Sequence, residues 1–167
     1  MSRRPKRVAL VAAAVVVAVL GAAQLVRPER TNPPIDASRT LQAQAGVSKG
    51  LIAVVDRACS DCHSNGTVWA RYPGVAPMSW VVARSVAEGR KAVNFSEWAA
   101  YSPDVRRALL ATSCQDAMTG KMPMSAYLLL RPEARLSPQD VETICAASRE
   151  GTRSTASVVH SPARSMP

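Results

Sequence analysis

The sequence predicts an all-α fold, in which one small helical domain follows an apolar N-terminal helix. Two observations support this class. Apolar residues recur at helical spacing in several segments, and the clearest of these begin at Ser–Pro pairs. No segment alternates apolar and polar residues convincingly with period two, so no β-strand is predicted. A chain of 167 residues has room for one such domain with flanking segments.

The N-terminal segment consists of a basic cytoplasmic flank, residues 1–7, and an apolar run, residues 8–26. A run of this length is just long enough to cross a bilayer as a helix, and the basic flank predicts that the N-terminus stays inside. We therefore expect a single-pass anchor in the cytoplasmic membrane, with the following domain in the periplasm or outside. The alternative is a signal peptide cleaved near Gly21, Ala22 and Ala23.

Residues 27–45 are predicted to form an extended linker, because they contain three prolines and few large apolar residues. The domain is expected over residues 46–150. Its first helix is predicted from about Leu41 to Ala58 and would present the next residue, Cys59, at its carboxyl end. Residues 151–167 have little apolar periodicity, so we expect a disordered tail.

Three further helices are predicted within the domain. The first runs from Ser79 to about Gly89, after a long loop rich in glycine and proline. The second starts at Ser102–Pro103 and stops at Gly120, and the third starts at Ser137–Pro138. Short turns are expected over residues 94–98 and 125–130.

The net charge of +9 lies mostly outside the domain. Residues 51–150 carry 11 basic and 10 acidic side chains, and the two signs are interleaved along the sequence. This pattern lacks the sustained basic surface of a nucleic-acid-binding protein, so we expect no nucleic-acid partner.

Cys59, Cys62 and His63 form the sequence CSDCH, which has the CxxCH spacing of a covalent attachment site for a c-type haem. The two thiols suit thioether bonds to the two vinyl groups of the porphyrin, and the imidazole next in line suits the iron. The predicted export segment supports this interpretation, because c-type haem is attached outside the cytoplasmic membrane. A zinc site is not favoured, since the only other histidine, His160, lies in the tail.

Three other interpretations of the cysteine pair remain open: a thioredoxin-like redox couple, a structural disulfide and a chance occurrence. The redox couple is less favoured, because such a pair usually opens a helix after a strand and no strand pattern precedes Cys59. Haem that stays on the chain during denaturing electrophoresis would separate the haem interpretation from these alternatives.

Met122 is the first candidate for the sixth iron ligand, because its thioether is a soft neutral donor and it lies in a break between two predicted helices. The following residue, Pro123, restricts the backbone of Met122 to extended conformations. Met124 is the nearest alternative, and an open iron position is the other.

Cys114 and Cys145 are the two cysteines that remain after haem attachment. Their even number and the oxidising compartment predict a disulfide between the second and third domain helices. Both residues fall on apolar helix faces, so two buried free thiols are the alternative.

The order of helix, CxxCH, loop, helices, Met–Pro and final helix matches the plan of a small cytochrome c-like domain. From Arg30 to about Ile144 the chain also resembles the bacterial haem-binding domain family, small exported proteins with a cytochrome c type attachment motif. The segments that carry the resemblance are CSDCHSNGT, APMSW, EGRKAVNFSEW, KMPMSAYLLL and PEARLS. The resemblance implies covalent haem on Cys59 and Cys62, with His63 as the proximal ligand.

The chain departs from the family pattern in two places. Relatives often read Pro-Trp-Tyr where this chain has Ala70, Arg71 and Tyr72, and they often carry histidine where it has Arg131. If that histidine binds iron in any relative, this chain lacks the equivalent ligand.

These observations lead us to expect a membrane-anchored monohaem c-type cytochrome that transfers single electrons. We expect an electron carrier rather than an enzyme, with one covalent haem c, a membrane or periplasmic redox protein as partner, and no small-molecule substrate. The main alternative is a haem-based sensor or ligand-binding module with an open distal iron site. A thiol oxidoreductase that uses Cys59 and Cys62 is the third.

Overall fold

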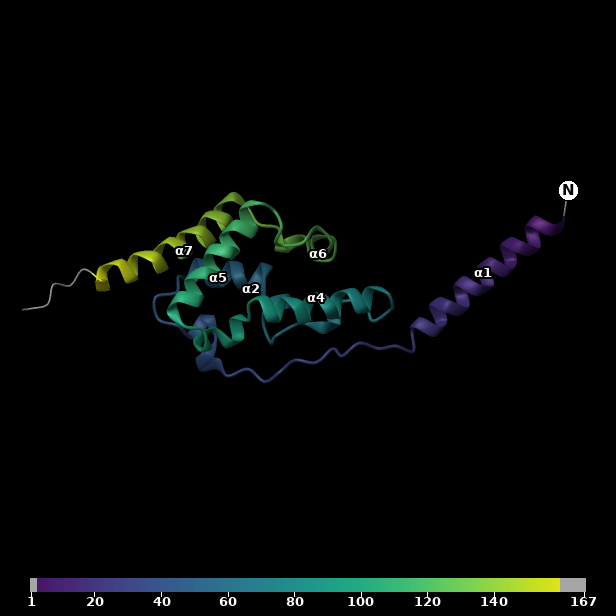
Figure 1. Ribbon diagram of the computed structural model, residues 1–167, viewed down its shortest axis with the longest axis horizontal. Coiled ribbons are helices and arrows are strands. Elements are labelled where there is room, and N and C mark those ends of the chain that lie inside the picture. Colours follow the sequence, from purple (N-terminus) through teal and green to yellow (C-terminus); the bar gives the residue numbers. More distant parts are fainter. Residues whose placement is uncertain (1–2, 160–167) are drawn as a thin grey trace, which may run out of the picture.

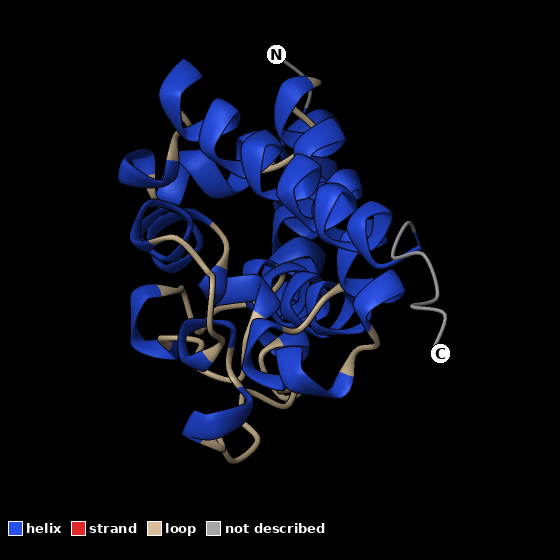
Figure 2. Ribbon diagram, turned by 90° about the vertical axis from the view of Figure 1, so that its left-hand side faces the viewer, coloured by secondary structure: helices blue, strands red, loops and turns tan. Residues whose placement is uncertain are grey.

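The computed structural model describes the backbone of residues 3–159 and the side chains of residues 6–150. Every regular element in that range is helical, and Figure 2 shows helices and connecting loops with no strand. The predicted all-α class is therefore confirmed. His160 lies outside the described residues.

The α-helices, in chain order, are α1 (Arg3–Ala23), α2 (Lys49–Ala58), α3 (Ser60–His63), α4 (Met78–Ala92), α5 (Pro103–Met118), α6 (Ser125–Leu130) and α7 (Pro138–Val159). The shorter 3-10 helices are η1 (Ala37–Arg39), η2 (Leu41–Ala43), η3 (Trp69–Arg71), η4 (Phe95–Ala100) and η5 (Pro132–Ala134). The helix α1 projects away from the rest of the molecule, which forms the domain (Figure 1).

The starts of the domain helices follow from local capping. Ser102 caps α5 by accepting a hydrogen bond from the Val105 N–H, and Gly120 follows α5 with a φ of 67°. At α7, Ser137 and Asp140 form a reciprocal capping box, with the Asp140 N–H donating to Ser137 Oγ at 3.1 Å and the Ser137 N–H donating to Asp140 Oδ2 at 2.8 Å. These two helix starts agree with the sequence prediction.

Two helix boundaries differ from the prediction. The helix before Cys59 begins at Lys49 rather than near Leu41, because Gly46 adopts a φ of 84° that breaks any longer helix and Ser48 caps a new one. At the other end, α7 continues through residues 151–159, the first part of the tail 151–167 that we expected to be disordered, and residues 160–167 lie outside the described residues. A glycine such as Gly151 costs only about 1 kcal/mol inside a helix, so it does not by itself end one.

The core lies where α2, α5, α7 and η4 meet. Its most buried side chains are Leu41, Leu51, Val54, Val55, Val93, Phe95, Trp98 and Ile144. The helices α5 and α7 pack side by side on one side of α2, and α3 packs against α4 on the other (Figure 1). The CxxCH segment, residues 59–63, therefore lies between the core helix α2 and the long helix α4. We call this segment the attachment turn.

Residues 27–45 were predicted to form an extended linker, and the structure bonds this segment to the domain. Their first half is extended, but Asn32 Nδ2 donates to Thr67 O at 2.9 Å, and Arg90 Nη2 donates to Asn32 Oδ1 at 2.8 Å. Leu41 is almost completely buried in the core. Few large apolar residues were needed, because polar side chains bond this segment to the domain and one leucine inserts into the core.

The disulfide expected between Cys114 and Cys145 is present and joins α5 to α7. It spans 31 residues of sequence, so replacing both cysteines with alanine should lower the free energy of unfolding by roughly 3–4 kcal/mol in the chain-entropy account. Urea unfolding of the double variant, compared with the reduced and oxidised wild-type protein, measures this loss. Two thiols that are both alkylated in denatured, unreduced protein would contradict the bond.

Candidate functional site

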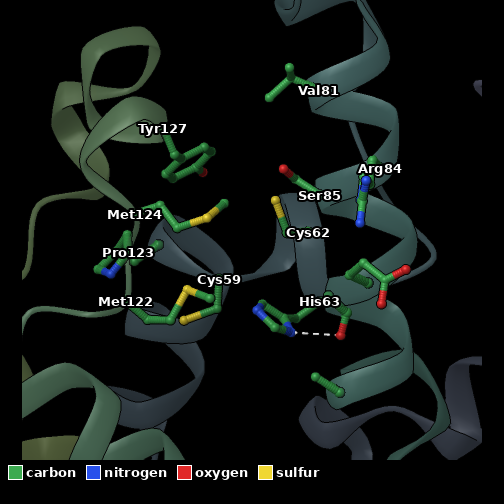
Figure 3. Close-up of a pocket in the computed structure, with 14 residues that line it drawn as sticks. Cys59, Cys62, His63, Val81, Arg84, Ser85, Met122, Pro123, Met124 and Tyr127 are labelled. Atoms are coloured by element: carbon green, nitrogen blue, oxygen red, sulfur yellow. Dashed lines mark hydrogen bonds between the residues drawn. The ribbon is translucent and has the colours of Figure 1, made fainter.

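A cavity of about 480 Å³ lies between α3, α4 and the segment from Met122 to Tyr127. α4 forms one side of the cavity, and the segment around α6, which contributes Met122, Pro123, Met124 and Tyr127, forms the opposite side (Figure 3). Cys59, Cys62 and His63 line the wall between these two sides. The cavity therefore brings together every sequence-predicted haem-site residue.

A second cavity of about 220 Å³ continues toward the core. Cys59, His63 and Met122 line both cavities, whereas Cys62 and Met124 line only the larger of the two. These three residues, together with Ala58, Ala92 and Pro123, mark the boundary between the two spaces. This position distinguishes Met122 from Met124 as a neighbour of His63.

The turn of α3 sets the geometry of the two cysteines. The N–H groups of Cys62 and His63 both donate to Cys59 O, at 3.1 and 3.0 Å, which closes one helical turn. Residues three apart on a helix lie on the same face, so both thiols point toward the cavity. They are not bonded to each other.

Neither thiol is poised to ionise. Burial raises the pKa of the Cys59 thiol to about 12 and that of the Cys62 thiol to about 11. A thiol-disulfide oxidoreductase needs the opposite, a nucleophilic cysteine whose pKa is lowered toward neutrality. The local environment thus disfavours the thioredoxin-like interpretation.

His63 is held through one of its ring nitrogens. Its Nδ1 lies 2.9 Å from Gly89 O and 3.2 Å from Val93 O, and because both partners are carbonyls, Nδ1–H is the donor. Burial lowers the pKa of the imidazole, against the effect of these carbonyls, so the ring is neutral at neutral pH. The other nitrogen, Nε2, keeps its lone pair and faces the cavity (Figure 3).

Gly89 is a site residue that the sequence did not identify. A Cβ atom at this position would lie 2.5 Å from Cys62 O and 3.0 Å from Cys62 C. The absence of a side chain therefore lets α4 pack directly against the backbone of the attachment turn. The same close approach brings Gly89 O within reach of His63.

Met122 and Met124 flank Pro123 between α5 and α6. The Met122 N–H donates to Asp116 O at 3.1 Å, which ties this residue to the end of α5. In Figure 3 its side chain extends toward Cys59 and His63, whereas Met124 lies nearer to Tyr127 and Cys62. The structure thus favours Met122 over Met124 as the residue that faces the imidazole.

These residues fit a covalently bound haem. Haem c needs two thiols that can form thioether bonds to its vinyl groups, and the site has them. Its iron needs ligands, and the site offers a neutral imidazole with a free nitrogen and the thioether of a methionine. The larger cavity falls within the roughly 300–1,000 Å³ typical of small-molecule sites, and its walls are mainly apolar.

Comparison with known protein families matches residues 18–149 to the haem-binding domain. The chain belongs to the haem-binding domain family. No curated protein matches the chain, and no solved structure does. The family match covers both cavities completely, so this haem-binding domain and the candidate site are the same part of the molecule.

Asp61, a buried carboxylate inside the attachment turn, is a second residue that the sequence analysis did not identify. Asp61 is 7% exposed and accepts hydrogen bonds from Tyr72 Oη at 2.6 Å, Arg131 Nη1 at 2.5 Å and Tyr127 Oη at 3.4 Å. Burial raises the pKa of both tyrosines, that of Tyr127 to about 12, so both hydroxyls remain donors. Asp61 therefore joins the attachment turn of the haem-binding domain to η5 and α6.

Arg131, where we noted a departure from the family pattern, is one of these partners rather than a free side chain. Its guanidinium also pairs with Glu133 Oε1 at 2.5 Å, and its side chain is only 12% exposed. No part of Arg131 lines either cavity. The only sequence signal that could have indicated the Asp61–Arg131 pair is the position of a charged residue, Asp61, between two cysteines.

Proposed function

We propose that the protein is a monohaem c-type cytochrome that carries single electrons at the outer side of the cytoplasmic membrane. The observation that supports this most strongly is the meeting of Cys59, Cys62, His63 and Met122 around one apolar cavity in a haem-binding domain. Haem iron supplies one-electron chemistry when bound, by alternating between its ferrous and ferric states. An electron carrier needs no further catalytic group.

Each of the four residues has a separate task in this proposal. Cys59 and Cys62 hold the porphyrin through thioether bonds. His63 offers Nε2 to the iron, while Gly89 O and Val93 O fix the orientation of its ring. Met122 would supply a thioether to the same iron, and a thioether ligand raises the reduction potential and excludes exogenous ligands.

We further propose that α1 is a retained membrane anchor. It contains an 18-residue window, Lys6–Ala23, with a mean hydropathy of 2.0, and none of that window is buried against the domain. Basic residues precede the apolar part, which favours export of the domain. The intact mass of the membrane-bound protein distinguishes a retained anchor from a cleaved signal peptide.

Covalent attachment is tested by producing the protein with a cytochrome c maturation system and staining for haem after denaturing electrophoresis. We expect haem to migrate with the wild-type chain and to be lost from the Cys59→Ser/Cys62→Ser variant. The matched control, Cys114→Ser/Cys145→Ser, should keep its haem, because those cysteines form the disulfide. Wild-type protein without attached haem would overturn the proposal.

The sixth ligand decides between electron transfer and ligand sensing. Reduced wild-type protein should bind carbon monoxide poorly, whereas Met122→Ala should bind it readily and have a reduction potential lower by roughly 0.1 V or more. Met124→Ala serves as the control and should behave like the wild type. Spectra of the reduced protein with and without carbon monoxide measure this. Ready binding by the wild type, unchanged in Met122→Ala, would favour the sensor.

A further inference from the structure

The segment that follows α1 is bonded to the domain. The side-chain amide of Gln24 pairs with both backbone groups of Ala76: Oε1 accepts from the Ala76 N–H at 2.9 Å, and Nε2 donates to Ala76 O at 3.3 Å. Trp80 Nε1 donates to Val26 O at 2.7 Å. Figure 1 accordingly shows the end of α1 beside the start of α4, at the opposite end of the molecule from α7.

Because of these contacts, no flexible linker separates the apolar helix from the domain. The helix ends at Ala23, and the very next residue is bonded to Ala76. If α1 spans a bilayer, Ala76 must therefore lie at the surface of that bilayer. A free linker would let any face of the domain approach the membrane, but this arrangement selects one.

The face that it selects is apolar. Val75, Met78 and Val81 are 62%, 43% and 54% exposed, and all three lie within five residues of Ala76. Single exposed valines are normal on a soluble surface, but several together mark an interaction site. We call Val75, Met78 and Val81 the apolar patch.

The surroundings of the apolar patch also suit a lipid surface. Trp80 lies between Met78 and Val81 in the sequence and donates its indole N–H to Val26 O, and tryptophan is enriched at membrane interfaces. Arg27 and Arg84 are exposed next to Val26 and one turn beyond Trp80. Guanidinium groups at those positions can reach lipid phosphates.

We propose that the apolar patch rests in the headgroup region of the bilayer that holds α1. The inference rests on the proposed function, because it requires α1 to span the membrane. Val81 and Arg84 also line the larger cavity, so the α4 edge of the haem site faces lipid. A redox partner that reaches this edge must itself be embedded in the membrane.

The test uses the full-length holoprotein in vesicles of phosphatidylcholine and phosphatidylglycerol. With two cysteines bonded to haem and two in the disulfide, a cysteine introduced at Val75 or Met78 is the only free thiol and takes a nitroxide label. Val105→Cys, at an exposed valine on α5, is the matched control, and Val15→Cys reports on α1. Power saturation compares the accessibility of each label to oxygen and to a water-soluble nickel chelate.

We expect the labels at positions 75 and 78 to favour oxygen several-fold more than the label at 105. Labels at 75 and 78 that are as accessible to nickel as the one at 105, with position 15 inside the bilayer, would overturn the inference while leaving the anchor intact. A label at position 15 that is open to nickel would overturn the anchor and the inference together. Haem attachment is measured separately by electrophoresis, so its failure is distinguishable from both.

Discussion

Replacement of Gly89 with alanine should disrupt the haem site, although it adds a single methyl group. The new Cβ would lie 2.5 Å from Cys62 O, 3.0 Å from Cys62 C and 3.1 Å from Cys62 Cβ. The first two of these atoms belong to the backbone of the attachment turn, which cannot rotate away as a flexible side chain would. α4 must therefore move, and Gly89 O then no longer holds His63 Nδ1.

We expect Gly89→Ala to lower the free energy of unfolding by about 1–3 kcal/mol or more, as overpacking of a close contact does. It should also reduce the haem retained after denaturing electrophoresis and alter the spectrum of the reduced protein, because the imidazole is displaced.

Gly50→Ala is the matched control. Gly50 lies inside α2, where an added Cβ would meet Thr143 Cγ2 at an ordinary 3.5 Å. Alanine favours a helix over glycine by up to about 1 kcal/mol, so this variant should be as stable as the wild type or more stable. Equal stability and equal haem content in both variants would show that the close packing of α4 is not needed.

The sequence-based predictions succeeded where the signal is local. Ser102–Pro103 and Ser137 begin helices because capping involves residues that are only a few positions apart. The disulfide between Cys114 and Cys145 could be predicted because these are the only two cysteines left after haem attachment.

The predictions failed where a contact joins distant segments. Gly89 reads as an ordinary residue of a helix, and its role exists only because Cys62 packs against it from 27 residues away. The linker prediction missed the contacts of residues 27–45 for the same reason. Their polar side chains bond to distant residues such as Thr67, and the sequence pattern gives no sign of these partners. The sequence gives no sign that Asp61 is buried, because its partners Tyr72, Tyr127 and Arg131 come from other segments of the chain.

Loss of the Asp61–Arg131 pair is the second large effect that we expect. Both side chains are almost completely buried, at 8% and 12% exposure, and their atoms lie 2.5 Å apart. Removal of one member of a buried pair leaves the other charge without its partner, which typically costs about 3–5 kcal/mol. Here Arg71, whose Nη1 lies 3.8 Å from Asp61 Oδ2, and the remaining bonds of Asp61 to Tyr72 and Tyr127 should keep the cost of Arg131→Met near the lower value.

Asp61→Asn and Arg131→Met, alone and together, form a double-mutant cycle that isolates the pair. The double variant should lose less stability than the sum of the single variants, by an amount between about 0.5 and 3 kcal/mol. Glu133→Gln is the control, because Glu133 is the exposed partner of the same guanidinium, and it should change stability little. Strict additivity in urea unfolding would mean that the pair contributes nothing as a pair.

The same variants separate a positioning role from a purely structural one. Arg131 lies directly after α6, so its bond to Asp61 ties the segment that carries Met122 to the turn that carries Cys59 and His63. If this bond holds Met122 over the imidazole, Asp61→Asn should raise the rate at which the reduced protein binds carbon monoxide, even under conditions where it is fully folded. An unchanged rate in a destabilised variant would restrict Asp61 to folding. A raised rate would make the residue between the two cysteines a determinant of the sixth ligand.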